Sequence, residues 1–298
     1  MEVRGIDIHV HLSDKETIAA AGQRASQMAN YFGRERNPVT ADELADIYRS
    51  KGLMAVLQNT ADPTVTGLPP VSNDHIANAV KRNPDVFLGF GAIDPWMGRL
   101  AVDEVRRCAE ELGLRGIGEL NPGRQHFYPN DPRFYPIWEE IDRQGMVVLF
   151  HTGMAGAGAG APGGLGVKLK YTRPIPYLDD IAADFPSLQI IGAHPAWPYQ
   201  SEALAVARHK ANFFIDLSGW APKYFGEELR RYAGTVLQDK MLFGTDWPHI
   251  DIERWFREFA EFGFPEEVNQ KILLGNARKL LKLDSASTPA SGPDLRTS

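Results

Sequence analysis

Short apolar runs alternate with longer amphipathic stretches along almost the whole chain. Apolar runs bounded by turn residues are typical of buried strands, and apolar residues three and four positions apart are typical of helices that cover a sheet. The pattern predicts eight strands, at residues 3–10, 53–57, 86–93, 114–120, 146–150, 188–192, 213–217 and 241–244. It predicts eight intervening helices, at residues 41–50, 73–81, 99–112, 132–143, 177–185, 202–210, 227–237 and 252–261.

Strict alternation of strand and helix favours parallel strands with right-handed crossovers, and eight such units close into a (β/α)8 barrel. An open doubly wound sheet is the alternative, but the first strand leads into HVHLSDKET rather than into a glycine-rich phosphate loop. We therefore predict an α/β fold in which residues 1–283 form a single (β/α)8 TIM barrel. Residues 266–282 would add a C-terminal helical extension, and residues 284–298 lack apolar periodicity and are expected to be disordered.

The composition, 43% hydrophobic and 23% charged over 298 residues, is that of an ordinary soluble domain. A formal charge of −6 and the absence of a basic stripe argue against a nucleic-acid partner and leave a small molecule as the expected one. Cys108 is the only cysteine, which excludes an internal disulfide and fits a reducing cytoplasm. No apolar stretch is long enough to span a membrane, so a cytoplasmic location without membrane contact is expected. An assembly of identical chains is compatible with these features.

Three connections are much longer than the others: residues 13–37, 59–72 and 152–174, after the first, second and fifth predicted strands. Long connections at the carboxyl ends of barrel strands commonly carry function. The connection at 152–174 is too rich in glycine and alanine to hold a shape by side-chain packing alone. It is either a mobile lid or an insert without a role of its own.

His9 and His11 are two positions apart on an apolar strand, so their side chains project to the same side of the sheet. Two imidazoles, a carboxylate and an open coordination position are typical of a catalytic metal site. The pair alone is weak evidence, because two histidines can also be a hydrogen-bonded feature of a core.

His151, His194 and Asp246 each lie just after the apolar run of a predicted strand. In a barrel the carboxyl ends of the strands converge on the catalytic face. Each histidine alone could be bonded to backbone, and Asp246 alone could cap a helix. Together with the histidine pair, however, the strand-end positions favour a metal site.

The segments IDIHVH, LFHTG, IIGAHPAWP and LFGTDWPH, in this order, resemble the amidohydrolase superfamily. The resemblance covers residues 3–281 and is greatest to the branch of α-amino-β-carboxymuconate-ε-semialdehyde decarboxylase and related aromatic-acid decarboxylases. It implies that one divalent ion is bound by four residues, with His194 beside it as the catalytic acid or base. These ligands are His9, His11, His151 and Asp246. Retention of both motif histidines favours zinc, with manganese as the alternative.

Binuclear members of the superfamily carry a carboxylated lysine after the fourth strand, where this chain reads LRGIGELNP. The absence of lysine there favours one ion. Glu119 could bridge a second ion, with His194 as a further ligand. We favour the alternative, in which Glu119 accepts a hydrogen bond that orients an imidazole or a substrate group.

A bound zinc ion can lower the pKa of its water to about 7 and can polarise a carbonyl group. Asp246 would position or deprotonate that water, and His194 would donate a proton to the leaving atom. The segments GVKLKYTRP and DLSGWAPKYF resemble a sub-branch that cleaves 4-hydroxyphenyl-β-ketoacyl thioesters of coenzyme A. Hydrolytic C–C cleavage of such a thioester is therefore the favoured prediction. Decarboxylation of a phenolic or muconic acid and lactone hydrolysis are the alternatives.

Candidate substrate contacts follow from these two reactions. Lys168, Lys170 and Arg173 would face the phosphates of coenzyme A, or would merely solvate a loop. A decarboxylase would need a cation such as Arg124, Arg173 or a lysine to hold the carboxylate. Aromatic residues near the predicted strand ends could line a pocket, although packing residues look the same in sequence: Trp197, Trp220, Tyr224 and His249. A non-catalytic barrel with a structural ion is the remaining hypothesis, and the open coordination position argues against it.

Overall fold

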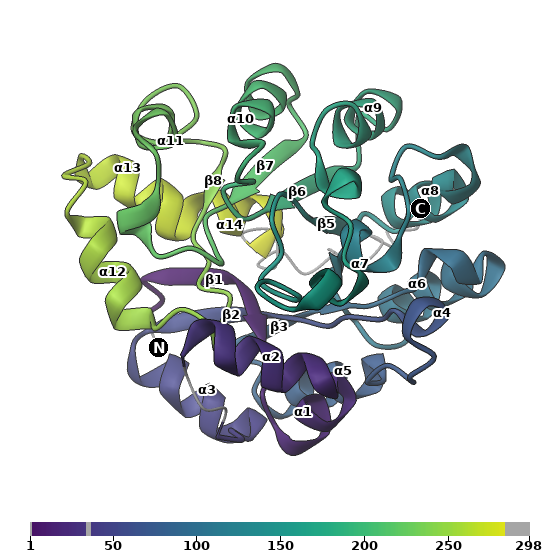
Figure 1. Ribbon diagram of the computed structural model, residues 1–298. Coiled ribbons are helices and arrows are strands. Elements are labelled where there is room, and N and C mark those ends of the chain that lie inside the picture. The colour runs from purple at the N-terminus through teal and green to yellow at the C-terminus, as the bar shows by residue number, and fades with distance from the viewer. Residues whose placement is uncertain (1, 34–36, 284–298) are drawn as a thin grey trace, which may run out of the picture.

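The computed structural model describes residues 2–33 and 37–283. In this part of the chain, parallel strands pair in sequence order from β1 to β8 and helices surround them (Figure 1). The strands are β1 (Gly5–His11), β2 (Leu53–Gln58), β3 (Phe87–Gly91), β4 (Gly116–Leu120), β5 (Val147–His151), β6 (Gln189–Ala193), β7 (Phe213–Asp216) and β8 (Met241–Leu242). The predicted (β/α)8 barrel is confirmed.

The barrel closes where the segment after β8 meets β1. The amide of Ile8 donates to the carbonyl of Phe243 at 2.9 Å, and the amide of Asp246 donates to the carbonyl of His9 at 2.9 Å. The predicted strand at 241–244 is shortened to two residues, because the amide of Phe243 donates instead to Ile272 in the C-terminal extension. The ends of the remaining strands also differ by a few residues from the prediction, as expected where periodicity is weakest.

The helices that alternate with the strands form the outer layer. They are α3 (Ala41–Ser50), α5 (Asn73–Arg82), α6 (Arg99–Glu110), α8 (Tyr135–Arg143), α9 (Tyr177–Asp184), α10 (Gln200–His209), α11 (Glu227–Ala233) and α12 (Ile252–Ala260). The helix predicted at 132–143 begins with a separate 3-10 turn at Pro132–Phe134, and the one predicted at 227–237 ends at Ala233. Their amphipathic pattern explains the layer, since each helix buries one apolar face on the barrel.

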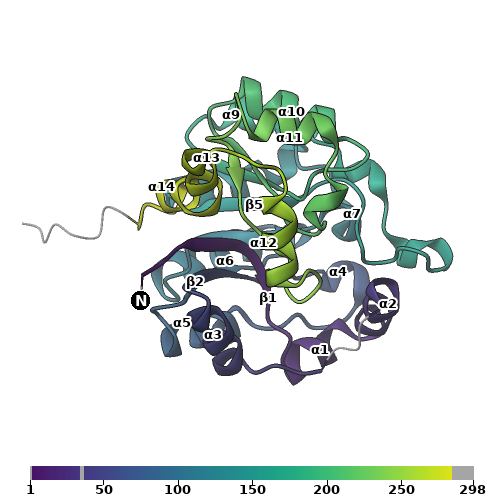
Figure 2. The same cartoon turned by 90° about the vertical axis from the view of Figure 1, so that its left-hand side faces the viewer.

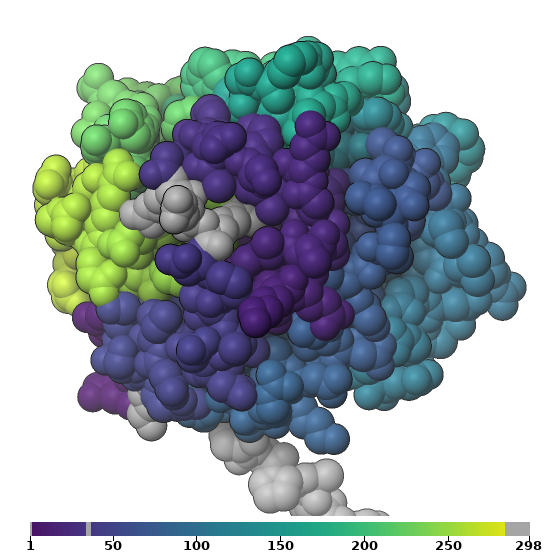
Figure 3. Space-filling model, turned by 60° about the horizontal axis from the view of Figure 1, so that its bottom comes forward, coloured from purple at the N-terminus to yellow at the C-terminus, as the bar shows by residue number. Residues whose placement is uncertain are grey.

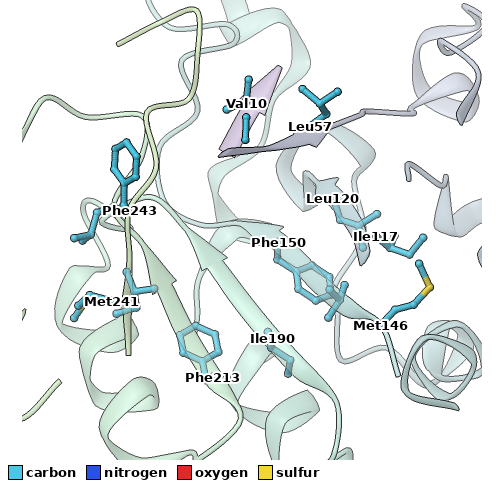
Figure 4. Packing of buried hydrophobic residues seen from close by; sticks show 14 of the residues in the cluster. Val10, Leu57, Ile117, Leu120, Met146, Phe150, Ile190, Phe213, Met241 and Phe243 are labelled. Atoms are coloured by element: carbon cyan, nitrogen blue, oxygen red, sulfur yellow. The ribbon is translucent and has the colours of Figure 1, made fainter. Parts of the chain in front are cut away.

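Two apolar clusters result from the alternation of side chains along the strands. The inner cluster fills the barrel with residues such as Ile6 and Leu149. The outer cluster lies between strands and helices, and Figure 4 shows part of it, including Leu120, Phe150 and Phe213. Complete burial of one such side chain contributes roughly 1.5–3 kcal/mol to folding.

The C-terminal extension lies at the amino ends of the strands. It consists of α13 (Glu266–Gln270), a π-helical turn (Lys271–Gly275) and α14 (Asn276–Leu280), so the single predicted helix at 266–282 is divided. The amide of the Asn276 side chain donates to the carbonyl of Met241 at 2.8 Å. Figure 2 shows α14 at the opposite end of the barrel from α1 and α2. The predicted tail 284–298 lies outside the described residues.

The connection after β1 contains two helices that the sequence pattern did not predict, α1 (Lys15–Ala21) and α2 (Gln23–Phe32). Short helices also stand after β2 and β4: α4 (Pro63–Thr66) and α7 (Pro122–Gln125). In Figure 3 the purple N-terminal segment lies at the surface of the molecule. This segment covers part of the mouth of the barrel, because α1 and α2 line the cavity described below.

The glycine-rich connection after β5 is held against α2. The side chain of Gln27 donates to the carbonyl of Ala159 at 2.8 Å and accepts from the amide of Gly158 at 2.9 Å. Two 3-10 turns, Pro162–Gly166 and Leu169–Thr172, follow along the connection. Its shape therefore depends on backbone hydrogen bonds, which a segment of glycine and alanine can still make.

The thiol of Cys108 is buried in α6, where burial raises its pKa to about 12. Within residues 2–33 and 37–283, no helix combines the length and apolar character needed to cross a membrane.

Candidate metal centre and active site

A register shift in β1 turns its two histidines into the barrel. Between Asp7 and Val10, β1 advances three residues while β2 advances two. Ile8 already belongs to the inner cluster, so the additional residue allows His9 and His11 to face the interior as well. An additional residue in one strand commonly redirects a side chain at a functional site.

The same irregularity occurs in β4 and positions Glu119. Between Ile117 and Leu120, β4 advances three residues while β5 advances two. The carboxylate of Glu119 thereby reaches the interior, where its Oε1 accepts a hydrogen bond from Nδ1 of His151 at 2.6 Å. His151 is the last residue of β5, so the two side chains come from neighbouring strands.

Asp246 and His194 lie just beyond strand ends in left-handed backbone conformations, with φ of 59° and 70°. Such conformations are unfavourable for residues other than glycine and occur most often at functional sites. The backbone at Gly219 fixes the His194 ring further, because a Cβ atom there would lie 2.4 Å from the ring nitrogen Nδ1. Tertiary contacts therefore hold both side chains at the mouth of the barrel.

His9, His11 and Asp246 form a compact group of possible metal ligands. The Nε2 atoms of the two histidines are 3.2 Å apart. Oδ1 of Asp246 lies 3.3 Å from Nε2 of His11 and 3.7 Å from Nε2 of His9. Ligand atoms around a tetrahedral zinc ion lie about 3.3 Å apart, so this group has the size that a divalent cation requires.

A second group shares His9 and adds Glu119 and His194. Nε2 of His194 lies 3.7 Å from Oε1 of Glu119 and 3.1 Å from Nδ1 of His151. Nε2 of His151 is buried and has no hydrogen-bond partner in the described part of the chain. Because Nδ1 of this ring donates to Glu119, its Nε2 carries a lone pair, which is the form of histidine that binds a metal ion.

A carboxylate orients His9 through the ring nitrogen that faces away from the other possible ligands. Nδ1 of His9 donates to Oδ2 of Asp216 at 2.6 Å, so Nε2, which lies 3.2 Å from Nε2 of His11, is the ring nitrogen left for a metal ion. Burial lowers the pKa of His9, but Asp216 and the further carboxylates Asp246 and Glu119 outweigh burial and raise it to about 10. Such an excess of carboxylate over the other charges favours a cation at the centre.

The carboxyl groups themselves remain ionised. Burial acts to raise the pKa of Asp246, but His249, His11 and His9 hold it well below its usual range. Burial likewise opposes ionisation of Glu119, and His151 and His194 overcome this effect and lower its pKa. Both carboxylates are therefore available as anionic ligands or as acceptors.

The donor set fits one divalent ion. Three of the four predicted ligands, His9, His11 and Asp246, lie close enough together to hold one ion. The fourth, His151, is not part of this group, although its buried Nε2 has no hydrogen-bond partner among the described residues. Glu119 accepts a hydrogen bond from His151, as predicted. It also belongs to the second group of possible ligands, so a role as a metal ligand is compatible with its position. His194 donates to or accepts from the Ser218 hydroxyl at 2.9 Å, and its other nitrogen faces the centre.

Replacement of Asp216 by asparagine tests the orienting role of this carboxylate. We expect D216N to weaken metal binding by about 10- to 100-fold, because a neutral amide replaces the charged acceptor that orients the His9 ring. Competition with a fluorescent chelator would measure the affinity. Asp239, a surface residue paired with Lys271, provides the matched control D239N. Equal metal affinity of D216N and the wild-type protein would contradict the assigned role.

A cavity of about 520 Å3 opens in front of the two groups of possible ligands. His11, Asp246 and residues of α1 and α2 contribute to its lining. Phe32 of α2 stacks on His249 with ring centroids 4.6 Å apart, so α2 closes over the site. Five of the predicted substrate contacts line this cavity: Glu119, Arg124, Trp220, Tyr224 and His249.

Four other predicted contacts do not line the cavity. Lys168 is exposed, and Lys170 lies over the rings of Tyr128 and Tyr171. Arg173 is paired with Glu202. Trp197 is 53% exposed, and its ring lies 6.0 Å from that of Trp220. The expectation that the basic triplet faces the substrate site is therefore not met, because the backbone after β5 turns these side chains outward.

Several residues of the site were missed in the sequence. Asp216 ends β7 and Ser218 follows it, so the strand-end argument that selected His151 would also have found them. Arg24 and Asp62 also line the cavity, but no local pattern distinguishes them from surface residues.

Residues 6–283 match the sequence profile of a protein family described as amidohydrolase. The chain belongs to the amidohydrolase family. The superfamily resemblance seen in the sequence is thereby confirmed, and this amidohydrolase is an enzyme, since the family is one of enzymes. The hypothesis of a non-catalytic barrel is wrong.

The chain is similar in sequence to known acid decarboxylases. It is 25% identical over 252 residues to a gamma-resorcylate decarboxylase of Rhodococcus jostii, covering 72% of this chain and 76% of the relative. It is 38% identical over 79 residues to a 2-amino-3-carboxymuconate-6-semialdehyde decarboxylase of Dictyostelium discoideum, where the match covers 26% of this chain and 22% of the relative.

A solved structure shares the fold. The 5-carboxyvanillate decarboxylase of Novosphingobium aromaticivorans, complexed with manganese and 4-hydroxy-3-methoxy-5-nitrobenzoic acid, superposes with a TM-score of 0.66 at 19% identity. The superposition covers 94% of this chain and 96% of the other.

Proposed function

We propose that this amidohydrolase catalyses the metal-dependent, nonoxidative decarboxylation of a hydroxylated aromatic acid. The observation that carries the proposal is the group His9, His11 and Asp246, of which His11 and Asp246 line a cavity of about 520 Å3. Cavities of this size accommodate small organic ligands. Decarboxylase relatives matched over most of the chain support this reaction over the others that the superfamily performs.

His9, His11 and Asp246 would hold one divalent cation, with Nε2 of His151 available as a further ligand. A bound cation would anchor an oxygen of the substrate and stabilise the negative charge that develops on it. The sequence favours zinc, and the structural relative contains manganese. Metal analysis of the purified protein distinguishes the two.

His194 is the proposed proton donor. In the reaction the bond between the ring and the carboxyl group breaks, its electron pair stays on the ring carbon, and that carbon accepts a proton as carbon dioxide leaves. Nε2 of His194 faces the centre while Ser218 holds Nδ1, so the ring is positioned to deliver its proton from Nε2. A hydroxyl group on the substrate ring makes the ring carbon more basic and assists the transfer.

The sequence favoured hydrolytic C–C cleavage of an aromatic β-ketoacyl thioester of coenzyme A. This reaction has less support than decarboxylation. The basic residues assigned to the coenzyme A phosphates lie outside the cavity. The relatives that match over most of their length are decarboxylases of an aromatic acid. We therefore place decarboxylation ahead of both thioester and lactone hydrolysis.

Assays of the metal-loaded protein test this proposal. The substrates are 2,6-dihydroxybenzoate, 5-carboxyvanillate, an aromatic β-ketoacyl thioester and a lactone. We expect one molecule of carbon dioxide for each phenol formed from at least one of the acids, and loss of turnover after chelation of the metal. Product identification by chromatography with carbon dioxide detection would measure this. Hydrolysis of the thioester or the lactone without release of carbon dioxide would overturn the proposal.

A further inference from the structure

Two arginines and one aspartate form a charged group in the wall of the cavity. Arg24 belongs to α2, Asp62 follows β2, and Arg124 lies in α7. Nη2 and Nε of Arg124 donate to Oδ2 of Asp62 at 2.8 and 3.3 Å, and Nη1 of Arg24 donates to the same oxygen. One carboxylate oxygen thus joins both guanidinium groups.

The two arginines and the aspartate do not balance in charge. Two guanidinium groups and one carboxylate leave one net positive charge, and all three side chains are largely shielded from solvent, with exposed fractions of 23%, 12% and 8% for Arg24, Arg124 and Asp62. Burial lowers the pKa of Arg24, the neighbouring Arg124 lowers it further, and Asp62 offsets these effects only in part. Since a buried charge is costly without a partner, an anion would stabilise the group.

The donors needed to bind an anion are present. All side-chain hydrogen bonds of Arg24 within the described ranges come from Nη1, so its Nε and Nη2 remain for a ligand. Planar guanidinium groups bind carboxylates through two parallel hydrogen bonds, which makes arginine well suited to this ligand.

This group is separate from the possible metal centre. Arg24 lies in α2, Asp62 follows β2 and Arg124 lies in α7 after β4, whereas the proposed ligands come from β1, β5 and the segment after β8. Among the described residues, the side chains of Arg24 and Arg124 bond only to Asp62. A ligand that engages both groups must therefore carry two polar ends.

We infer that Arg24 and Arg124, held together by Asp62, bind a second anionic group of the substrate, so that the substrate is a hydroxylated aromatic diacid. This inference rests on the proposed function, because it takes the cavity to be the substrate site. One acidic group meets the metal centre and the other meets the arginines. Acids with a single charge fill the cavity without neutralising the arginine group.

Binding of unreactive probes tests the inference without turnover. Isophthalate and terephthalate carry two carboxylates, benzoate carries one, and none has the ring hydroxyl that assists decarboxylation. Calorimetry with metal-loaded protein should show that at least one diacid binds ~10-fold or more tightly than benzoate. In R24Q and in R124Q this preference should fall to about 2-fold or less, with little change in the affinity for benzoate.

Matched variants keep the test informative. R24K and R124K retain the charge and should keep part of the preference. They keep the test informative if loss of the ion pair in R24Q and R124Q lowers the stability of the protein. Arg49, bound to Asp85 on the surface, provides the control R49Q, which should bind all probes as the wild-type protein does. Equal binding of diacids and benzoate by the wild-type protein, or an unchanged preference in folded R24Q and R124Q, would overturn the inference. A diacid preference without decarboxylation of any acid would instead contradict the proposed function alone.

Discussion

Replacement of His11 by alanine is expected to remove the metal ion and to lower the rate of decarboxylation by ~1000-fold or more. Nε2 of His11 lies within 3.3 Å of both Nε2 of His9 and Oδ1 of Asp246, so its loss opens the group of ligands on one side. The metal content, measured by mass spectrometry of purified protein, should fall from about one ion per chain to a small fraction of one.

The exposed His209 at the end of α10 supplies the matched control, because H209A removes an imidazole that lies outside the cavity. This control should retain its metal and its activity. If H11A instead kept a full complement of metal, the ion would belong to the second group, formed by His9, Glu119 and His194. The proposed ligand set would then be wrong.

Replacement of His194 by alanine is expected to leave the metal bound and to lower the rate by about 100- to 10,000-fold, the range typical for loss of a proton donor. The ring lies beside the proposed ligands, and Ser218 holds its Nδ1 at 2.9 Å, as expected for a group that transfers a proton from Nε2. Rates and metal content of H194A, measured on the same preparation, separate proton transfer from metal binding.

Added imidazole provides a second readout, since it can replace a missing proton donor but cannot restore a purely structural contact. We expect imidazole to recover part of the activity of H194A and to leave H11A inactive. Loss of the metal from H194A would show that His194 is a ligand, and the assignment of one ion with His194 outside its coordination would fail.

The barrel itself could be predicted because its signal is local. Alternation of apolar runs and amphipathic stretches reports which segments are strands and which are helices, and eight such units have few ways to pack. The strand-end rule likewise selected His151, His194 and Asp246, because the carboxyl ends of parallel strands meet at one face. Short local motifs were enough for both steps.

The helices α1 and α2 were not predicted from the sequence. They lie largely at the surface, and only Ala25 of their residues is buried. Both are stabilised by contacts outside their own sequence, such as those of Gln27 with the backbone at Gly158 and Ala159. Such contacts have no periodicity along the chain.

Residue order was sufficient to predict the barrel, its C-terminal extension and the histidines and aspartate at the strand ends, because each depends on near neighbours in the chain. The side chains that complete the site depend on distant segments. The register shift that turns His9 inward is defined against β2, Asp216 orients that ring across 207 positions, and Arg24 meets Arg124 only through Asp62. These contacts form only when the chain folds, so the spacing of residues along one strand or helix does not predict them.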